Sequence, residues 1–285
     1  MSGQATRAAA LRAATARLAA AGVAGAARDA RLLMRHASGL EAAALSAALG
    51  APMAPDEAAL FYACVARRAA RAPLSHITGA REFWGRRFAV SAAALDPRPE
   101  TEVLVGWALE EAAPAQALDL GVGSGCILLS LLAAWPQAQG LGVDASAAAL
   151  ELARANAAAL GLGARARFAQ GDWLRGVAGR FGVIVANPPY LTAAEMAALP
   201  PEVRAEPALA LDGGPDGLCA YRAIAAGLAD ALAPGGAAFF EVGAGQAQDV
   251  AAILARTALG PVETRADLDG RARVLRLRRD AGPRD

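Results

Sequence analysis

The sequence predicts an α/β protein in which a small all-helical domain precedes a mainly parallel sheet covered by helices. Two observations predict this fold. Apolar residues recur at helical spacing over about the first 72 residues, where Gly22, Gly39 and Gly50 mark helix ends. From about residue 100 onward, short apolar runs alternate with helical patterns, which is typical of parallel strands joined by helices.

These patterns divide the chain into a helical domain (1–72), a β-hairpin and extended linker (73–99) and a sheet domain (100–285). Residues 73–79 and 82–85 mix β-formers with glycines, which favours a hairpin. Pro97 and Pro99 predict an extended segment, because each proline fixes its own φ and restricts the preceding residue. We expect strands at 117–120, 140–144, 166–170, 183–186, 237–242 and 274–277.

Composition limits the partners that the protein can take. The 285 residues carry a net charge of +1, and all 28 basic residues are arginines scattered among acidic residues. Non-specific nucleic-acid binding needs a basic face, so we expect no direct nucleic-acid partner. The locally basic stretch from Arg271 to Arg284 is interpreted as a solvated edge strand and tail.

The cysteines and the hydropathy pattern point to a reducing compartment. Cys64, Cys126 and Cys219 share no close spacing and the chain has only two histidines, so we expect neither a disulfide set nor a metal site. No apolar run has the length of a membrane span, and the N-terminal pattern lacks the apolar core of a secretory signal. We expect a cytoplasmic protein without membrane partners. We also expect it to act as a monomer.

A glycine-rich turn, Asp119-Leu120-Gly121-Val122-Gly123-Ser124-Gly125, follows the first strand of the sheet domain. Glycines let the backbone turn tightly and approach a ligand closely, so we predict that Gly121, Val122, Gly123, Ser124 and Gly125 bind a cofactor. The Gly-x-Gly-x-Gly spacing is shorter than that of dinucleotide enzymes. Led by an acidic residue, it resembles the first motif of Rossmann-like methyltransferases. A plain glycine turn is the alternative.

Two residues at later strand ends extend this prediction. Asp144 ends the second strand at the position of a carboxylate that accepts ribose hydroxyls. Ser146 is available to cap the next helix, which leaves Asp144 for that role. Trp173 follows the third strand, in the turn that lines the adenine pocket of such methyltransferases. Its indole can pack on the adenine ring or simply fill core space.

The tetrapeptide Asn187-Pro188-Pro189-Tyr190 follows the fourth strand, where open α/β sheets have their active sites. Its two prolines stiffen the loop and remove two backbone donors. The side-chain oxygen of Asn187 and the carbonyl of Pro188 can then accept hydrogen bonds from one NH₂ group, while Tyr190 offers a flat face. We predict that these four residues bind the substrate and catalyse methylation of a planar amide or amino nitrogen. A plain turn is the alternative.

Taken together, these residues resemble the release factor glutamine methyltransferases, often called PrmC or HemK. The resemblance covers most of the chain. Its more specific stretches are Pro73-Leu74 with Ile77 and Gly79, Glu82-Phe83-Trp84-Gly85, Pro97-Arg98-Pro99-Glu100-Thr101-Glu102, Glu206-Pro207, Gly213-Gly214-Pro215-Asp216-Gly217-Leu218, Tyr221-Arg222 and Asp267-Leu268-Asp269-Gly270-Arg271. Asp96 stands where the family usually has an aliphatic residue and His76 where a tyrosine is common.

The resemblance implies a helical release-factor-binding domain, a β-hairpin linker and a Rossmann-like domain with a mainly parallel seven-stranded sheet. It implies methylation of the side-chain amide nitrogen (N5) of the glutamine in the Gly-Gly-Gln motif of peptide chain release factors. S-adenosyl-L-methionine would contact residues 121–125, Asp144, Trp173 and Asn187, and the glutamine would contact residues 187–190. For Glu100 and Thr101 we predict only a position near the pocket, and a structural capping role is equally compatible with the sequence.

Three other functions compete with this one. An adenine-N6 DNA methyltransferase acts on a similar conjugated NH₂ group, but it needs a basic cleft, and the net charge of +1 argues against one. A second alternative methylates another residue of a release factor or ribosomal protein. The third is a non-enzymatic module that binds a release factor or the ribosome and keeps the cofactor fold as a scaffold. The intact loop at Asn187 and the presence of Asp144 argue against this last function.

Overall fold

The computed structural model describes residues 5–282. The chain forms two compact units. The first comprises the chain up to Gly79 together with Pro200–Ala205, and the second comprises Ala80–Leu199 and the chain from Glu206 onward.

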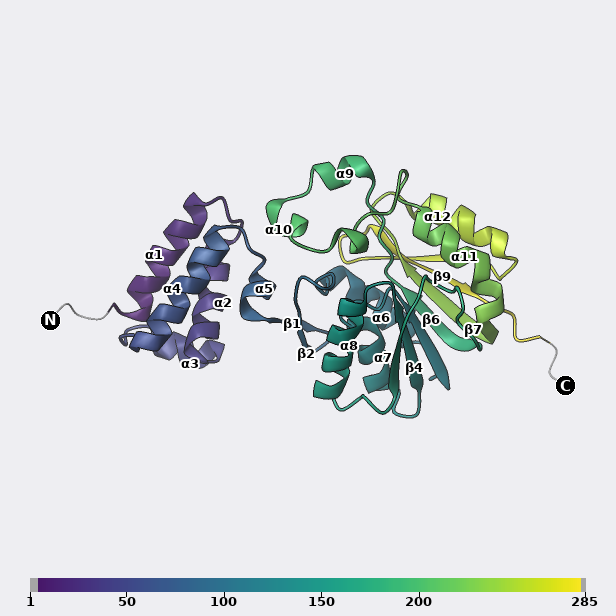
Figure 1. Cartoon of the computed structure of the whole chain (residues 1–285), viewed down its shortest axis with the longest axis horizontal. Coiled ribbons are helices and arrows are strands. Elements are labelled where there is room, and N and C mark those ends of the chain that lie inside the picture. The colour runs from purple at the N-terminus through teal and green to yellow at the C-terminus, as the bar shows by residue number, and fades with distance from the viewer. Residues whose placement is uncertain (1–4, 283–285) are drawn as a thin grey trace. The chain divides into compact units, whose positions relative to one another are not determined.

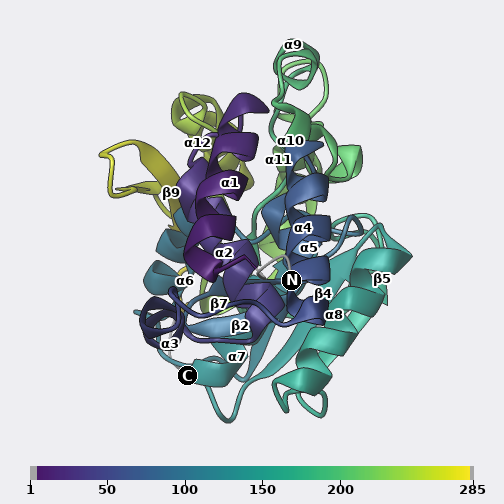
Figure 2. The ribbon, with the colours of Figure 1, turned by 90° about the vertical axis from the view of Figure 1, so that its left-hand side faces the viewer.

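The first unit is a helical bundle, as the apolar spacing predicts. Its helices are α1 (Arg7–Ala20), α2 (Ala26–Ser38), α3 (Ala42–Ala47), α4 (Pro55–Ala69) and α5 (Leu74–Thr78). Figure 1 and Figure 2 both show α1, α2 and α4 side by side. Leu18, Leu33 and Phe61 are fully buried where these helices meet. Thr6 begins α1 by accepting a hydrogen bond from the Ala9 amide, at 3.3 Å.

A distant segment of the chain belongs to this helical unit. The short helix α10 (Pro201–Arg204) carries Glu202, which pairs with Arg68 at 3.0 Å and with Arg71 at 2.6 Å. Arg68 also pairs with the buried carboxylate of Asp29, at 2.9 Å. The hydrogen bond from Arg71 lowers the pKa of Glu202 to about 2. Charge pairing therefore attaches residues 200–205 to the helical unit.

The second unit begins with the predicted hairpin, formed by β1 (Ala80–Phe83) and β2 (Arg86–Ala89). The residues before it do not join the hairpin, contrary to the expectation for 73–79. They form helix α5, which ends at Gly79 in the left-handed conformation. The Gly79 amide donates to the Ser75 carbonyl at 2.7 Å, so local helical bonds outweigh the β-propensity of this segment.

The main sheet has seven strands, and its order is β5-β4-β3-β6-β7-β9-β8. Their bounds are β3 (Gln116–Leu120), β4 (Gln139–Asp144), β5 (Ala166–Gln170), β6 (Phe181–Ala186), β7 (Leu232–Glu241), β8 (Glu263–Ala266) and β9 (Ala272–Arg278). The strands from β5 to β7 pair in parallel, and β9 pairs antiparallel with both β7 and β8. The chain order reverses between β3 and β6, which is where sheets of this kind bind ligands.

Helices cover both faces of the sheet (Figure 1). One face packs against α6 (Glu102–Ala108), α7 (Cys126–Ala134) and α8 (Ala147–Ala159). The other packs against α11 (Cys219–Ala231) and α12 (Ala247–Leu254). Helices α9 (Ala193–Ala197) and α10 and the 3-10 turns η1 (Pro99–Thr101), η2 (Ala208–Ala210) and η3 (Ala255–Thr257) complete the described elements. None of the described helices is long and apolar enough to cross a membrane.

The C-terminal strand is not the edge strand that the sequence suggested. β9 lies between β7 and β8, and its Val274, Leu275 and Leu277 are buried. The edge is β8, whose polar sequence Glu-Thr-Arg-Ala gave no apolar pattern to predict a strand. The arginines of β9 are paired with acidic side chains, as in the 2.6 Å contact of Arg276 with Glu263, so β9 itself presents no free basic face. Arg284, the last arginine of the predicted basic stretch, lies outside the described residues.

Candidate active site

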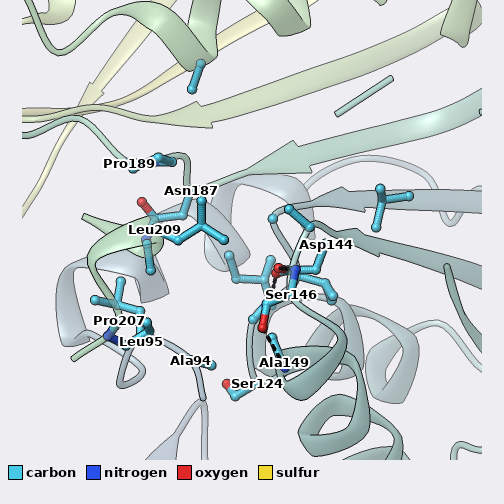
Figure 3. A pocket seen from close by; sticks show the side chains of 18 of the residues that line it. Ala94, Leu95, Ser124, Asp144, Ser146, Ala149, Asn187, Pro189, Pro207 and Leu209 are labelled. Carbon is cyan, nitrogen blue, oxygen red and sulfur yellow. Dashed lines mark hydrogen bonds between the residues drawn. The ribbon is translucent and has the colours of Figure 1, made fainter. Parts of the chain in front are cut away.

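A cavity of about 560 Å³ opens at the carboxyl ends of the parallel strands β3, β4, β5 and β6. All of its lining residues belong to the second unit. Figure 3 shows Asp144 and Ser146 on one side of the cavity and Asn187 and Pro189 on the other. The volume is typical of sites for a small organic ligand. The residues predicted from the first, second, third and fourth strand ends therefore meet at one cavity.

The glycine-rich turn supplies the floor between β3 and α7. Gly121, Gly123 and Gly125 all have positive φ, at 73°, 54° and 82°, which side chains rarely adopt. Gly121 and Gly123 line the cavity, together with Val122 and Ser124. Gly125 does not line it. Gly125 caps α7 and packs so tightly that a Cβ there would lie 3.0 Å from Leu129. Gly125 therefore shapes the turn from behind.

Asp144 connects this turn to the next helix. Its carboxylate accepts hydrogen bonds from the Gly123 amide and the Ser146 amide, both at 2.9 Å. The side chain of Ser146 caps α8 by accepting from the Ala149 amide at 3.2 Å, as predicted. Asp144 is thus not used as the helix cap. It lines the cavity with a carboxylate that is oriented by two backbone donors.

Trp173 lies in a conformation that is costly for a residue with a side chain. Its φ is 51°, and it lines the cavity next to Gly171 and Asp172. A Cβ built on Gly121 would lie 3.4 Å from the indole, so the ring packs directly against the glycine turn. Such strain, of about 1–3 kcal/mol, tends to occur at ligand sites.

The residues around the glycine turn fit a bound adenosyl group. Gly121 and the flat indole of Trp173 line one part of the cavity, and Asp144 presents acceptor oxygens at the same cavity. Behind the turn, Asp119 is fully buried, and its Oδ1 has no hydrogen-bond partner among the described residues. Burial raises the pKa of Asp119 to about 7.

The tetrapeptide after β6 forms the opposite wall. Asn187 and Pro189 line the cavity, whereas Pro188 and Tyr190 do not. Pro188 is buried, and burial also raises the pKa of Tyr190. The carbonyl of Tyr190 accepts a hydrogen bond from Gln246 Nε2 at 2.9 Å. The loop is therefore held from behind while Asn187 faces the cavity.

Two family models match successive parts of the chain. Residues 9–79 match the family model of the PrmC N-terminal domain, and residues 88–201 match that of the methyltransferase small domain. The release factor glutamine methyltransferase of Cereibacter sphaeroides is 51% identical over 94% of this chain and 97% of its own length. Its counterpart in Rhodospirillum rubrum is also 51% identical, over 94% and 83%.

The chain belongs to the release factor glutamine methyltransferase family. Solved structures of lower identity share the methyltransferase fold. The hMettl16 catalytic domain gives a TM-score of 0.58 at 16% identity, over 77% of this chain and 82% of that one. A methyltransferase from Pyrococcus furiosus gives 0.52 at 15% identity, over 68% and 88%. The prediction of a Rossmann-like domain with a seven-stranded sheet behind a helical domain is confirmed.

Other parts of this family member complete the cavity. For Thr101 the sequence predicted a position near the pocket, whereas for Arg98 and Leu209 it predicted no place in the site. Thr101 lines the wall beside Asn187, whose Nδ2 donates to the Thr101 hydroxyl at 3.2 Å. Arg98 lines the cavity too, and Glu206 pairs with it at 2.6 Å. Leu209 lies at the wall and is 61% exposed. The motifs around these residues resembled the family, but no local pattern directs them to this cavity.

The two departures from the family pattern lie in different units. Asp96 lines the cavity, and its amide donates to Glu206 at 3.1 Å. The unusual carboxylate therefore belongs to the cavity wall, next to Arg98. His76 lies on α5 of the helical unit, and its carbonyl accepts a hydrogen bond from Arg67. The difference at position 96 is thus the one that touches the site.

Proposed function

We propose that this chain methylates the side-chain amide nitrogen (N5) of the glutamine in the Gly-Gly-Gln motif of peptide chain release factors, using S-adenosyl-L-methionine. One observation carries the proposal: Asn187 and Pro189 line the same cavity as Gly121, Gly123 and Asp144. Family membership supports the choice of a glutamine amide over an adenine amine, because the relatives named above are release factor glutamine methyltransferases.

The proposed chemistry follows from the acceptors of the loop. An amide nitrogen is a poor nucleophile, because its lone pair is delocalised into the carbonyl. The oxygen of Asn187, which lines the cavity, would accept one of its hydrogens and help to turn its lone pair toward the methyl donor. The carbonyl of Pro188 would accept the other hydrogen only if the loop presented it to the cavity, which Pro188 does not line in this structure. When bound, S-adenosyl-L-methionine supplies an electrophilic methyl group on a sulfonium. The same acceptors would stabilise the positive charge that develops on the nitrogen before it loses a proton.

The surroundings of the loop support a rigid acceptor pair. Prolines at 188 and 189 fix two φ angles and leave no backbone donor that could repel the substrate NH₂ group. The loop also packs closely against a glycine cluster, since a Cβ at Gly213 would lie 2.7 Å from the Tyr190 Cα. Preorganised acceptors lose little freedom when the substrate binds, which favours catalysis over mere binding.

We propose that the cofactor contacts the glycine turn, Asp144, Trp173 and Asn187. Asp144 would accept the ribose hydroxyls, residues 121–124 would approach the cofactor through their backbone, and Trp173 would pack on the adenine ring. Asn187 would contact both the cofactor and the substrate. Gly125 would act only through the shape of the turn, because it packs against Leu129.

The protein partner is proposed to be the release factor itself, bound as substrate by the helical domain over residues 1–72. The protein would act as a monomer in the cytoplasm, where translation termination takes place, and would need no direct nucleic-acid partner.

A two-substrate assay tests this proposal against the DNA alternative. The chain is incubated with methyl-labelled cofactor and either a purified release factor or duplex DNA, at low and high salt. We expect label on the release factor alone, with little dependence on salt. Salt-sensitive label on adenine would establish the DNA enzyme. Cofactor binding without transfer to either substrate would support the non-enzymatic module.

A further inference from the structure

The far end of the loop 187–190 is held by a side chain from another element. Gln246 stands at the start of α12 and donates a hydrogen bond from its Nε2 to the carbonyl oxygen of Tyr190, at 2.9 Å. This is the usual length of an N–H···O bond. The contact therefore ties the loop that follows β6 to the helix that follows β7.

Two glycines enclose the side-chain amide of Gln246. A Cβ at Gly217 would lie 2.5 Å from its Nε2 and closer still to the carbonyl oxygen of Tyr190. A Cβ at Gly243 would lie 2.5 Å from its Oε1 and 2.8 Å from Cδ2 of Tyr190. Cβ atoms in proteins essentially never come within 3.0 Å of such neighbours. The amide of Gln246 thus occupies space that two missing side chains leave, and this packing directs its Nε2 at Tyr190.

A purely structural role would not favour glutamine at position 246. The Oε1 of Gln246 is buried and has no hydrogen-bond partner among the described residues. A buried acceptor left without a partner costs about 1–3 kcal/mol. A methionine side chain has a similar length and carries no such acceptor. The glutamine is therefore better explained by the hydrogen bond that it donates to Tyr190.

The loop itself connects the position of Tyr190 to that of Asn187. Pro188 and Pro189, which lie between them, have fixed φ angles and no amide hydrogen. The loop can therefore absorb little of a shift at Tyr190 by rotation about these bonds. Because Asn187 lines the cavity, a displaced Tyr190 backbone would move an acceptor of the proposed substrate.

We propose that Gln246 is a positioning residue for the methyl transfer, which holds the backbone of Tyr190 so that Asn187 keeps its place at the cavity wall. This inference rests on the proposed function. Gln246 does not line the cavity, so its effect on the reaction must pass through the loop. The effect falls mainly on turnover, because a misplaced acceptor matters most when charge develops on the substrate nitrogen.

Two variants and one control test this role in the full-length protein. Gln246→Met keeps the length of the side chain but cannot donate to Tyr190, and Gln246→Glu keeps its shape but replaces the NH₂ donor by an oxygen. We expect each to lower kcat about 10-fold or more, with the KM for the release factor and the Kd for S-adenosyl-L-methionine changed less than about threefold. The Tm of Gln246→Met should change little, because the substitution also removes the unpaired Oε1. Gln248→Met makes the same change at an exposed position of α12 and should alter none of these values.

The outcomes separate this inference from the proposed function. If the wild-type protein does not label the release factor, the proposed function fails and the positioning role fails with it. If the wild type is active and Gln246→Met keeps its kcat, only the positioning role fails. A loss of cofactor affinity as large as the loss of kcat, or the same loss of kcat in Gln248→Met, would also overturn the role, because either result indicates a general disturbance. Should Gln246→Met not fold, Gln246→Glu decides the question by the same comparison.

Discussion

Asn187 and Asp144 line one cavity but depend on different neighbours. Asn187 is held by the Thr101 hydroxyl, on the wall made by the loop after β6. Asp144 is held by the amides of Gly123 and Ser146, beside the glycine turn. Since the two side chains share no partner, substitutions at these positions are expected to affect different kinetic constants.

For Asn187→Ala, we predict a loss of about 10²–10³-fold in kcat, because one acceptor for the developing positive charge is removed. The Kd for S-adenosyl-L-methionine should change far less. Steady-state kinetics with a release factor and equilibrium binding of the cofactor measure the two effects. Equal losses in turnover and in cofactor affinity would contradict this assignment.

For Asp144→Ala, we predict the opposite pattern. Cofactor affinity should fall about 10–100-fold, because a charged acceptor for the ribose hydroxyls is lost. Asp144→Asn is the matched control for the structural part of this loss, since it keeps the size of the side chain near Gly123 and Ser146. It should fall between the wild type and the alanine variant in a calorimetric titration. An unchanged Kd in Asp144→Ala would refute the ribose role.

At the residue scale, the sequence predicted the site residues that belong to contiguous motifs at strand ends. Asp144 ends a strand that the apolar pattern predicts, and Trp173 and Asn187 each follow one, so the carboxyl edge of a parallel sheet brings them together. Leu209 lies in no such motif. Its position depends on the path of the chain after α10, which local spacing does not encode.

At the scale of elements, the segment around α10 depends on one acidic side chain. Glu202 is 19% exposed and pairs with two arginines of the helical unit. For Glu202→Gln we predict a loss of about 1–2 kcal/mol in the stability of that unit at neutral pH, between the values of exposed and buried pairs. Glu41→Gln removes an exposed pair with Arg35 in the same unit and should have almost no effect.

The sign of the pH dependence follows from the lowered pKa of Glu202. The folded value of about 2 lies below the ordinary value of 4.5, so the pairing stabilises the fold fully above 4.5 and is lost as the pH falls toward 2. The difference in unfolding free energy between the wild type and Glu202→Gln should therefore shrink over that range. A difference that stays constant with pH, or none at pH 7, would contradict the account.

Elements with long apolar patterns were predicted from the sequence, whereas polar or short elements were not. β4 and β6 lie within two residues of the expected bounds, because their buried positions carry apolar residues or glycine. β8 is polar along its length and was missed. That omission also made β9 look like the edge, although its Val274 and Leu275 are buried between two neighbouring strands.

At the scale of the molecule, the two units suggest a division between recognition and chemistry. The cavity is lined by the second unit alone, which has its own two apolar cores. A chain that begins at Ala80 should therefore keep its cofactor affinity but lose contacts with the whole release factor. We predict that its KM for the intact factor rises about tenfold or more, equivalent to about 1.4 kcal/mol of lost binding.

A short peptide that carries the Gly-Gly-Gln motif is the control substrate for this truncation. Because the peptide reaches only the cavity, its KM should be similar for the truncated and the full-length chain. If the KM for the intact factor were also unchanged by the truncation, the helical domain would have no part in binding it.

The most direct test of the central claim identifies the atom that receives the methyl group. The full-length chain is incubated with a purified release factor and isotopically labelled S-adenosyl-L-methionine, and the factor is digested and sequenced by tandem mass spectrometry. We predict one labelled methyl group on the side-chain amide of the glutamine in the Gly-Gly-Gln motif, and none when that glutamine is replaced. Label on any other residue, or its persistence after the replacement, would contradict the account.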